Sequence, residues 1–405
     1  MEKPQNWMAL SSIQLGGAIC LPVILIGYEL TKKAGLSAAM SAIILGNIVL
    51  FCLAYVTAKM AFQSKKSTAA NAEYYFGPSG KYIAACFLAF SLISWFAIQT
   101  QVMSGDIQKL FIHYFGIDMP NTMVSVGLSL LMCSTAVFGV RGVSVLATLT
   151  LPMMLATLAA ALYYAQATSP LSVFVDGIAK TGEGFSSKCF SLVIAASIAA
   201  VVDLPTFFRH AATKRDSMIA TVLTFLVGIP AVELIGVLLG FWTEAKTLPE
   251  ALTIMDHPLF AVWVSIFILC AGWTTNNTNL YSAATAMHVL CPRLTERQSA
   301  LITALMCSIL SAIPLLANLS QILDLMGIGV ASMGGVILVA FLRKTPQAAL
   351  SLFSLIAGTA AGIANMLLGS FISEVAILDA MLVAAVTMLG VSKNTIKTIT
   401  EVYEV

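Results

Sequence analysis

Six consecutive polar residues, from Thr274 to Asn279, interrupt an apolar stretch two thirds of the way along the 405-residue chain. Apolar residues fill positions 259–272 before them and 280–290 after them, apart from a few small polar ones. Because an α-helix turns by about 100° per residue, six positions cover all its faces. Such a run cannot face lipid, where each unsatisfied amide or hydroxyl costs roughly 1–3 kcal/mol or more. We therefore expect other helices to enclose it around a wet, polar site, rather than the run serving only as hydrogen-bonding glue between helices.

The composition places the chain among polytopic membrane proteins. It is 59% hydrophobic and only 10% charged, whereas soluble domains contain about 25% charged residues. A formal net charge of +2 gives no reason to expect a nucleic-acid partner. The eight cysteines lie in or beside apolar segments without CxxC spacing, which indicates small core side chains rather than a metal site.

Twelve apolar windows of about 20 residues predict twelve membrane-spanning helices. They cover residues 8–30, 36–60, 80–105, 121–140, 144–167, 185–208, 217–242, 258–287, 298–317, 320–342, 347–371 and 375–392. With the N-terminus inside, the intervening loops place 15 of the 21 Lys and Arg residues on the inner side and 6 on the outer side. This asymmetry follows the positive-inside rule and predicts a multi-pass protein of the cell inner (plasma) membrane with both termini in the cytoplasm.

Two of these spans contain helix-breaking residues near their middles. The first span has the pair Gly16 and Gly17 followed by Pro22, and the sixth has Asp203 and Pro205. Matching breaks five spans apart predict two five-helix repeats of opposite topology, at 8–167 and 185–342. Two additional helices at 347–392 complete a single transmembrane domain over residues 1–405.

The third span carries an aromatic and an amide side chain that suit a flat ligand. Trp95 and Gln99 are four residues apart and so lie on one helix face. An indole that can stack, next to an amide with one donor and one acceptor edge, fits a planar heterocycle. Ionisable residues within spans are further candidates by default, and they are Asp106, Asp203, Glu233 and Asp324.

Several motifs together resemble the nucleobase–cation symporter family that contains bacterial cytosine permease and the hydantoin transporter. The strongest match is the WTTN(D/N)xxLY pattern of the cytosine-permease side of that family. The matching segments, in an order and spacing kept over nearly the whole chain, are Trp273–Tyr281, Ile44–Asn47, Trp95–Gln99, Gly334–Val336 and an FxR ending at Arg209. The resemblance implies an all-α fold of twelve helices, with a leucine-transporter-like 5+5 inverted repeat plus two C-terminal helices.

The resemblance, together with the pattern at Trp95 and Gln99, predicts the substrate site. Trp95 is expected to stack on a flat, uncharged nitrogen heterocycle, while Gln99 and Asn276 read its donor and acceptor edge. Ser197 aligns where relatives commonly have an aromatic that sandwiches the ring. Losing that stacking face, worth on the order of 1 kcal/mol, predicts a wider or more polar pocket than one built for cytosine.

The coupling cation is expected between the first and eighth helices, where the family resemblance places it. The predicted oxygen ligands are the Thr274 and Thr275 hydroxyls and three backbone carbonyls, those of Ala18, Leu21 and Ala271. Five uncharged oxygens suit Na⁺ in this architecture, and H⁺ stays open as the alternative. No resident cofactor is expected.

The favoured function is a secondary symporter for a nucleobase, either a cytosine-like pyrimidine or a purine. A hydantoin or allantoin, a thiamine-precursor pyrimidine or an amino acid is the alternative cargo on the same fold. A membrane-embedded enzyme is disfavoured because all four histidines fall at span ends, and a channel is disfavoured because broken helices favour an occluded pocket. The lipid bilayer and the small solute are the expected partners, and no obligate protein partner is evident.

Overall fold

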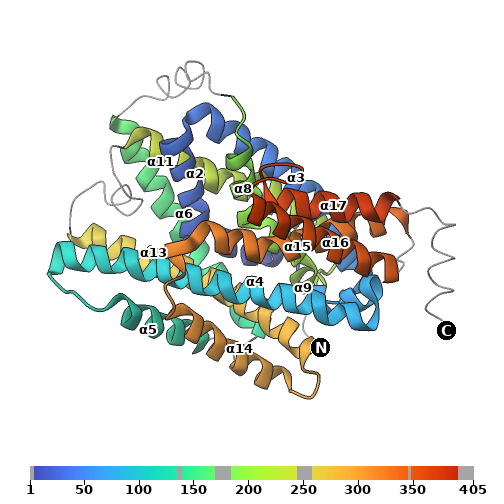
Figure 1. Ribbon diagram of the computed structural model, residues 1–405. Coiled ribbons are helices and arrows are strands. Elements are labelled where there is room, and N and C mark those ends of the chain that lie inside the picture. Colours follow the sequence, from blue (N-terminus) through green and yellow to red (C-terminus); the bar gives the residue numbers. More distant parts are fainter. Residues whose placement is uncertain (1–3, 135–138, 169–183, 244–257, 345–347, 391–405) are drawn as a thin grey trace, which may run out of the picture.

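In the part of the chain that the structure describes, the regular structure is helical, apart from one isolated bridge between Gln5 and Ala211 (Figure 1). The computed structural model describes residues 4–134, 139–168, 184–243, 258–344 and 348–390. Its elements are α1 (Trp7–Ala18), α2 (Leu21–Ala34), α3 (Leu36–Ser64), α4 (Thr68–Phe115), α5 (Asn121–Cys133), α6 (Gly139–Thr168), α8 (Ser187–Val202), α9 (Leu204–Phe208), α10 (Lys214–Thr221), the π-helix η2 (Val222–Gly228), α11 (Ile229–Trp242), α13 (Pro258–Leu290), α14 (Glu296–Ser311), the 3₁₀ helix η3 (Leu315–Asn318), α15 (Leu319–Arg343), α16 (Ala348–Leu368) and α17 (Ala376–Gly390).

Some sequence-based assignments fall on residues that the structure does not describe. These are the charged positions Lys3, Lys180, Lys246, Lys393 and Lys397, and the positions 135–138, 347 and 391–392 of the predicted spans. Among the described residues, seven helices are long and apolar enough to cross a membrane, or eight if α1 and α2 form one bent span. The multi-pass character is thus supported, while the count of twelve and the two inverted repeats stay predictions.

Both predicted helix breaks are present. Between α1 and α2, the backbone N–H of Cys20 donates to the Ala18 carbonyl at 2.8 Å instead of reaching back four residues to Gly16. Pro22, in the first turn of α2, has no backbone donor of its own, and the two helix axes differ by 51°. The sixth predicted span is broken at Asp203, which separates α8 from α9, with Pro205 in the first turn of α9.

The helix α4 is also interrupted, near its N-terminal end. Gly77 has a φ of 75°, a conformation that side chains with a Cβ rarely adopt, and Pro78 follows it. A short helix before Gly77 therefore leads at an angle into the long helical segment 78–115, which contains Trp95 and Gln99. In Figure 1 this long segment runs beside α13, against which it packs extensively.

The helices α2 and α11 form a second closely packed pair. A Cβ on Gly27 would lie 1.9 Å from the Glu233 carbonyl oxygen, and one on Gly236 would lie 2.0 Å from the Ile24 carbonyl oxygen. Small residues allow such backbone contact between membrane helices. The helix α2, which is the second half of the broken first span, is consequently in direct backbone contact with α11.

Candidate substrate and cation site

The polar run from Thr274 to Asn279 lies inside the protein, as its composition predicts. Thr274, Asn276 and Asn277 are at most 3% exposed, and the run continues α13 without a break. The Thr274 hydroxyl donates within the helix towards the Cys270 carbonyl at 3.0 Å, a bond that lets a hydroxyl sit in an apolar helix. Neighbouring helices α1 and α4 cover the run, so its remaining polar atoms face protein or an internal space.

A partly open cavity of about 90 Å³ lies where the two broken spans meet α4 and α13. Its walls include Trp95, Gln99 and Ser197, so three of the four predicted substrate residues meet around one space. The other lining residues are Gln14, Gly17, Ala18, Cys20, Val23, Leu92, Ala196, Ala199, Ala200, Ile229, Thr275, Thr278 and Asn279. None of the residues that line this cavity carries a formal charge. The space is small beside the 300–1,000 Å³ of typical pockets for drug-sized ligands.

Gln99 is a polar residue of this wall that is fully buried and lacks partners in the described structure. Its side chain is 0% exposed, and neither the amide nitrogen nor the amide oxygen has a hydrogen-bond partner within the described structure. An unpaired buried amide costs free energy that a bound ligand can recover. Gly272 on α13 lies against the same face of α4, where a Cβ would lie 2.3 Å from Met103 Sδ and 3.3 Å from Gln99 Nε2.

Asn276, the fourth predicted substrate residue, does not line the cavity. Its Nδ2 donates to Thr100 Oγ1 at 2.9 Å and to the Phe96 carbonyl at 3.2 Å. These contacts tie α13 to the face of α4 adjacent to the one that carries Trp95 and Gln99. The amide that reaches the cavity is Asn279.

The spacing within the polar run explains this difference. Thr275, Thr278 and Asn279 stand at i, i+3 and i+4, and therefore share a helix face. All three line the cavity. The sequence analysis assigns the second amide to Asn276, but the i, i+3, i+4 pattern starting from Thr275 was the available signal for Asn279.

A cluster of oxygens lies between the end of α1 and α13. The Thr274 hydroxyl is 2.6 Å from the Gly16 carbonyl oxygen and 3.0 Å from that of Ala271. The Thr275 hydroxyl is 3.0 Å from the Gly17 carbonyl oxygen and 2.9 Å from that of Ala271. Each hydroxyl has one proton but faces at least two carbonyl oxygens, so the cluster has more acceptors than donors. A small hard cation fits such a donor set.

Three of the five predicted cation ligands, Ala271, Thr274 and Thr275, thus gather at one point. For the first span, the carbonyls in contact with the two hydroxyls are those of Gly16 and Gly17, two and four positions before the predicted Ala18 and Leu21. The Ala18 carbonyl accepts the N–H of Cys20 at 2.8 Å. Sequence reasoning located the break correctly, but it could not say which carbonyls the break leaves facing α13.

A family profile for permeases of cytosine/purines, uracil, thiamine and allantoin matches residues 2–354. The chain belongs to this permease family. Its members are transporters and not enzymes, which agrees with the interpretation of the sequence. No curated protein matches the chain significantly.

Solved transporter structures resemble the permease in fold. Mhp1, a nucleobase-cation-symport-1 family transporter in a closed conformation with bromovinylhydantoin bound, superposes with a TM-score of 0.74 at 16% identity, over 96% of this chain and 92% of that one. A Na⁺-coupled sialic acid symporter gives 0.73 at 13% identity, covering 95% and 88%. MhsT in complex with L-phenylalanine gives 0.65 at 14% identity, covering 96% and 98%. With the family match, these likenesses support a cation-coupled transporter of the nucleobase type.

Proposed function

We propose that this permease imports a flat, uncharged nitrogen heterocycle by alternating access, coupled to Na⁺. The ring stacks on Trp95, while Gln99 and Asn279 pair with its donor and acceptor edge. The observation that carries this proposal is the Gln99 amide, fully buried in the cavity wall with both polar atoms unpaired. A nucleobase edge presents a neighbouring donor and acceptor that satisfy both amide atoms at once.

The absence of charge from the cavity wall supports a neutral cargo. Among the residues that line it, no side chain can form an ion pair with a carboxylate or an ammonium group. Burying an unpaired charge costs several kcal/mol, so an amino acid or sialic acid is the less suitable substrate. Cytosine, a purine, a hydantoin and a thiamine-precursor pyrimidine all satisfy this condition.

The coupling ion in this proposal lies among Gly16, Gly17, Ala271, Thr274 and Thr275. All five oxygens are uncharged and lie at the junction of the broken first span with α13. Binding there holds α1 against α13 beside the cavity, since Gly17 and Thr275 belong to both the oxygen cluster and the cavity wall. The cation and the heterocycle therefore favour the same conformation, which is the thermodynamic requirement for coupled transport.

The remaining architectural features of the proposal are twelve spans, two inverted repeats and two cytoplasmic termini in the inner membrane. Alternating access then follows from movement of the broken helices around the central cavity.

A thermal-shift screen of the purified protein tests the cargo. Cytosine, uracil, adenine, hydantoin, allantoin and amino acids are each added in NaCl and in choline chloride at one pH. Stabilisation by one or more heterocycles is expected because ligand binding to the folded state raises its apparent stability, and the shift should be larger in NaCl. Stabilisation by amino acids alone would overturn the nucleobase assignment, and equal shifts in both salts would overturn the Na⁺ assignment.

A further inference from the structure

A carboxyl group buried beside the cavity takes no part in the site described so far. Glu233 lies on α11 and is 0% exposed. Ile229, one turn earlier on α11, lines the cavity, and a helical turn advances only about 5.4 Å. The same relation holds on the partner helix α2, where Val23 lines the cavity and Gly27, four residues on, touches the Glu233 backbone.

Within the described structure, the side chain of Asn47 is hydrogen-bonded to this carboxyl group, and the pair leaves two oxygen atoms without partners. The Asn47 amide nitrogen on α3 donates to Glu233 Oε2 at 2.5 Å. Glu233 Oε1 and Asn47 Oδ1 are both buried without a hydrogen-bond partner in the described structure. Both are acceptors when Glu233 is ionised, so neither can satisfy the other. A proton on Glu233 supplies the missing donor.

Among the side chains that the structure describes on the surrounding helices, none is a free cation that could neutralise an ionised Glu233. The described elements packed against α11 are α1, α2, α3, α6 and η2. Their described titratable or charged side chains, together with the cap of α2, are Cys20, Tyr28, Glu29, Lys32, Lys33, Cys52, Tyr55, Lys59 and Tyr163. Lys33 pairs with Glu29 at 2.5 Å, Lys32 donates to the Thr243 carbonyl at 2.6 Å, and Lys59 lies over the Phe341 ring.

We propose that Glu233, held by Asn47, is a proton-binding site fed from the substrate cavity, so that a proton accompanies the heterocycle and Na⁺. The proton passes from cavity water to Glu233 Oε1 as the cavity closes, and returns to water when the cavity opens to the other side. This inference rests on the proposed transport function for its cargo, but the protonation of Glu233 can be tested separately.

Two structural features link the proton to transport. Closing the cavity removes water one helical turn from Glu233, and a dry, unpaired carboxylate is far more costly than a neutral carboxyl group. The backbone contacts at Gly27 and Gly236 also make α11 move with α2, which belongs to the same broken span as the Gly16 and Gly17 carbonyls. Loss of the proton thus opposes the closed state, as expected of a coupling ion.

Infrared difference spectroscopy on the full-length protein in liposomes tests the protonation. At neutral pH the unsubstituted protein should show the carbonyl stretch of a protonated, buried carboxylic acid, and Glu233→Gln should remove that band. Asp106→Asn, a change at another buried carboxyl group, is the matched control and should leave the Glu233 band in place. Identical carboxylic-acid bands in the unsubstituted and Glu233→Gln proteins would overturn the proposal.

Proteoliposomes with an internal pH indicator test the coupling, with cytosine, uracil, allantoin and hydantoin as probes. The transported probe should drive proton influx through the unsubstituted protein, and Glu233→Gln should reduce this influx to the level of empty liposomes. Glu233→Asp, which keeps a carboxyl group, should retain part of it. Probe counterflow without proton influx in the unsubstituted protein, or full influx in Glu233→Gln, would overturn the proton site and leave the proposed function intact. Absence of counterflow for every probe would instead overturn the proposed function, and the infrared band would still decide whether Glu233 binds a proton.

Discussion

Gln99 and Gln101 lie two residues apart on α4 and differ in the hydrogen bonding of their side-chain amides. Both are buried, at 0% and 5% exposure. The Gln101 amide nitrogen donates to the Ser311 carbonyl at 3.2 Å and to that of Ile313, and its oxygen accepts the Leu315 N–H at 3.0 Å. Gln99 has no partner for either atom in the described structure.

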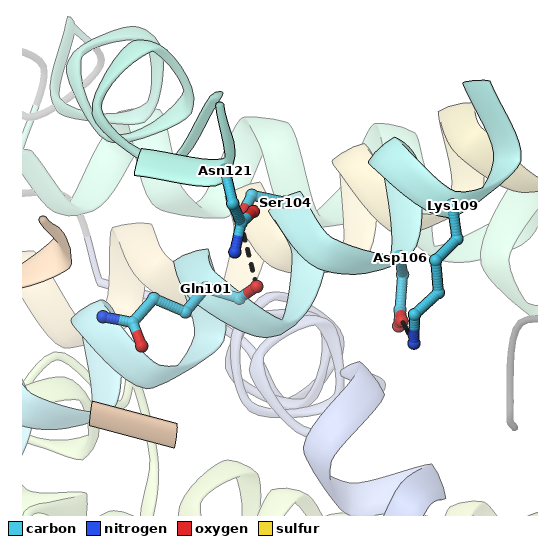
Figure 2. A network of polar contacts seen from close by, with 5 residues as sticks. All are labelled: Gln101, Ser104, Asp106, Lys109 and Asn121. Atoms are coloured by element: carbon cyan, nitrogen blue, oxygen red, sulfur yellow. Dashed lines mark hydrogen bonds and ion pairs between the residues drawn. The ribbon is translucent and has the colours of Figure 1, made fainter. Parts of the chain in front are cut away.

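The surroundings of Gln101 are those of a structural network. Ser104 lies on the next turn of α4, and its hydroxyl is 2.7 Å from the Asn121 side-chain oxygen at the start of α5 (Figure 2). Together Gln101 and Ser104 connect α4 to α5 and to the end of α14. A glutamine side chain thus holds helices together at position 101, whereas at position 99 its amide is available to a ligand. The predictions below test that distinction.

The largest expected effect is that of Gln99→Leu. Heterocycle affinity should fall about 100-fold or more, because both edge hydrogen bonds are lost and the ligand is left unpaired. The thermal stability of the ligand-free protein should not fall, because an unpaired polar group is removed.

Gln101→Leu should behave in the opposite way. It leaves the backbone groups at the end of α14 unpaired, at a cost of about 1–3 kcal/mol each, and so should lower stability while sparing the affinity of the folded protein. Thermal unfolding and equilibrium binding measure the two quantities separately. A Gln101→Leu protein with normal stability and no heterocycle binding would contradict the assignment of ligand binding to Gln99 and of helix packing to Gln101.

Trp95→Ala is expected to have the second-largest effect. Removing the stacking face should weaken heterocycle binding about 10- to 30-fold, since the ligand loses the apolar area buried against the indole and also about 0.5–1.5 kcal/mol of aromatic stacking beyond that area. The matched control is Trp273→Phe, because Trp273 packs against the core and does not line the cavity. The reverse pattern in a binding assay would place the pocket on the other side of α13.

Thr274→Ala and Thr275→Ala should each raise the Na⁺ concentration for half-maximal uptake about tenfold, because each removes one oxygen ligand worth about 1–1.5 kcal/mol. Thr285→Ala on the same helix is the control, since the Thr285 hydroxyl bonds only within α13, to the Tyr281 carbonyl at 2.9 Å. Uptake measured across a Na⁺ series provides the test. An unchanged Na⁺ dependence in both variants would show that Na⁺ does not bind at this cluster.

The smallest expected change in heterocycle affinity is that of Asn279→Ala, which is compared with Asn276→Ala. Asn279→Ala should weaken heterocycle binding about fivefold, which corresponds to one neutral hydrogen bond. Asn276→Ala should lower thermal stability, because it loses the contact with Thr100, and should change affinity less than about twofold. Binding isotherms of the two variants decide between them, and a larger affinity loss at Asn276 would support the original sequence-based assignment.

The sequence by itself determined the class of the protein and the places where its helices break. Hydropathy identifies segments for the bilayer because each residue contributes locally, and Gly16, Gly17, Pro22, Asp203 and Pro205 break helices through their own backbone chemistry. The enclosed polar run was predictable for the same reason, since no face of it could meet lipid. The family resemblance and a four-residue spacing point to Trp95, Gln99 and Ser197, which line one cavity.

Only the tertiary structure decided how each helix is rotated and which distant groups meet. The rotation of α13 directs Asn279 to the cavity and Asn276 to Thr100, and the bend after Ala18 points the Gly16 and Gly17 carbonyls at α13. Asn47 and Glu233, 186 positions apart, come together because α3 packs against α11. Helix rotation and contact depend on the packing of many side chains from several helices at once. Hydropathy and spacing along one segment do not contain that information.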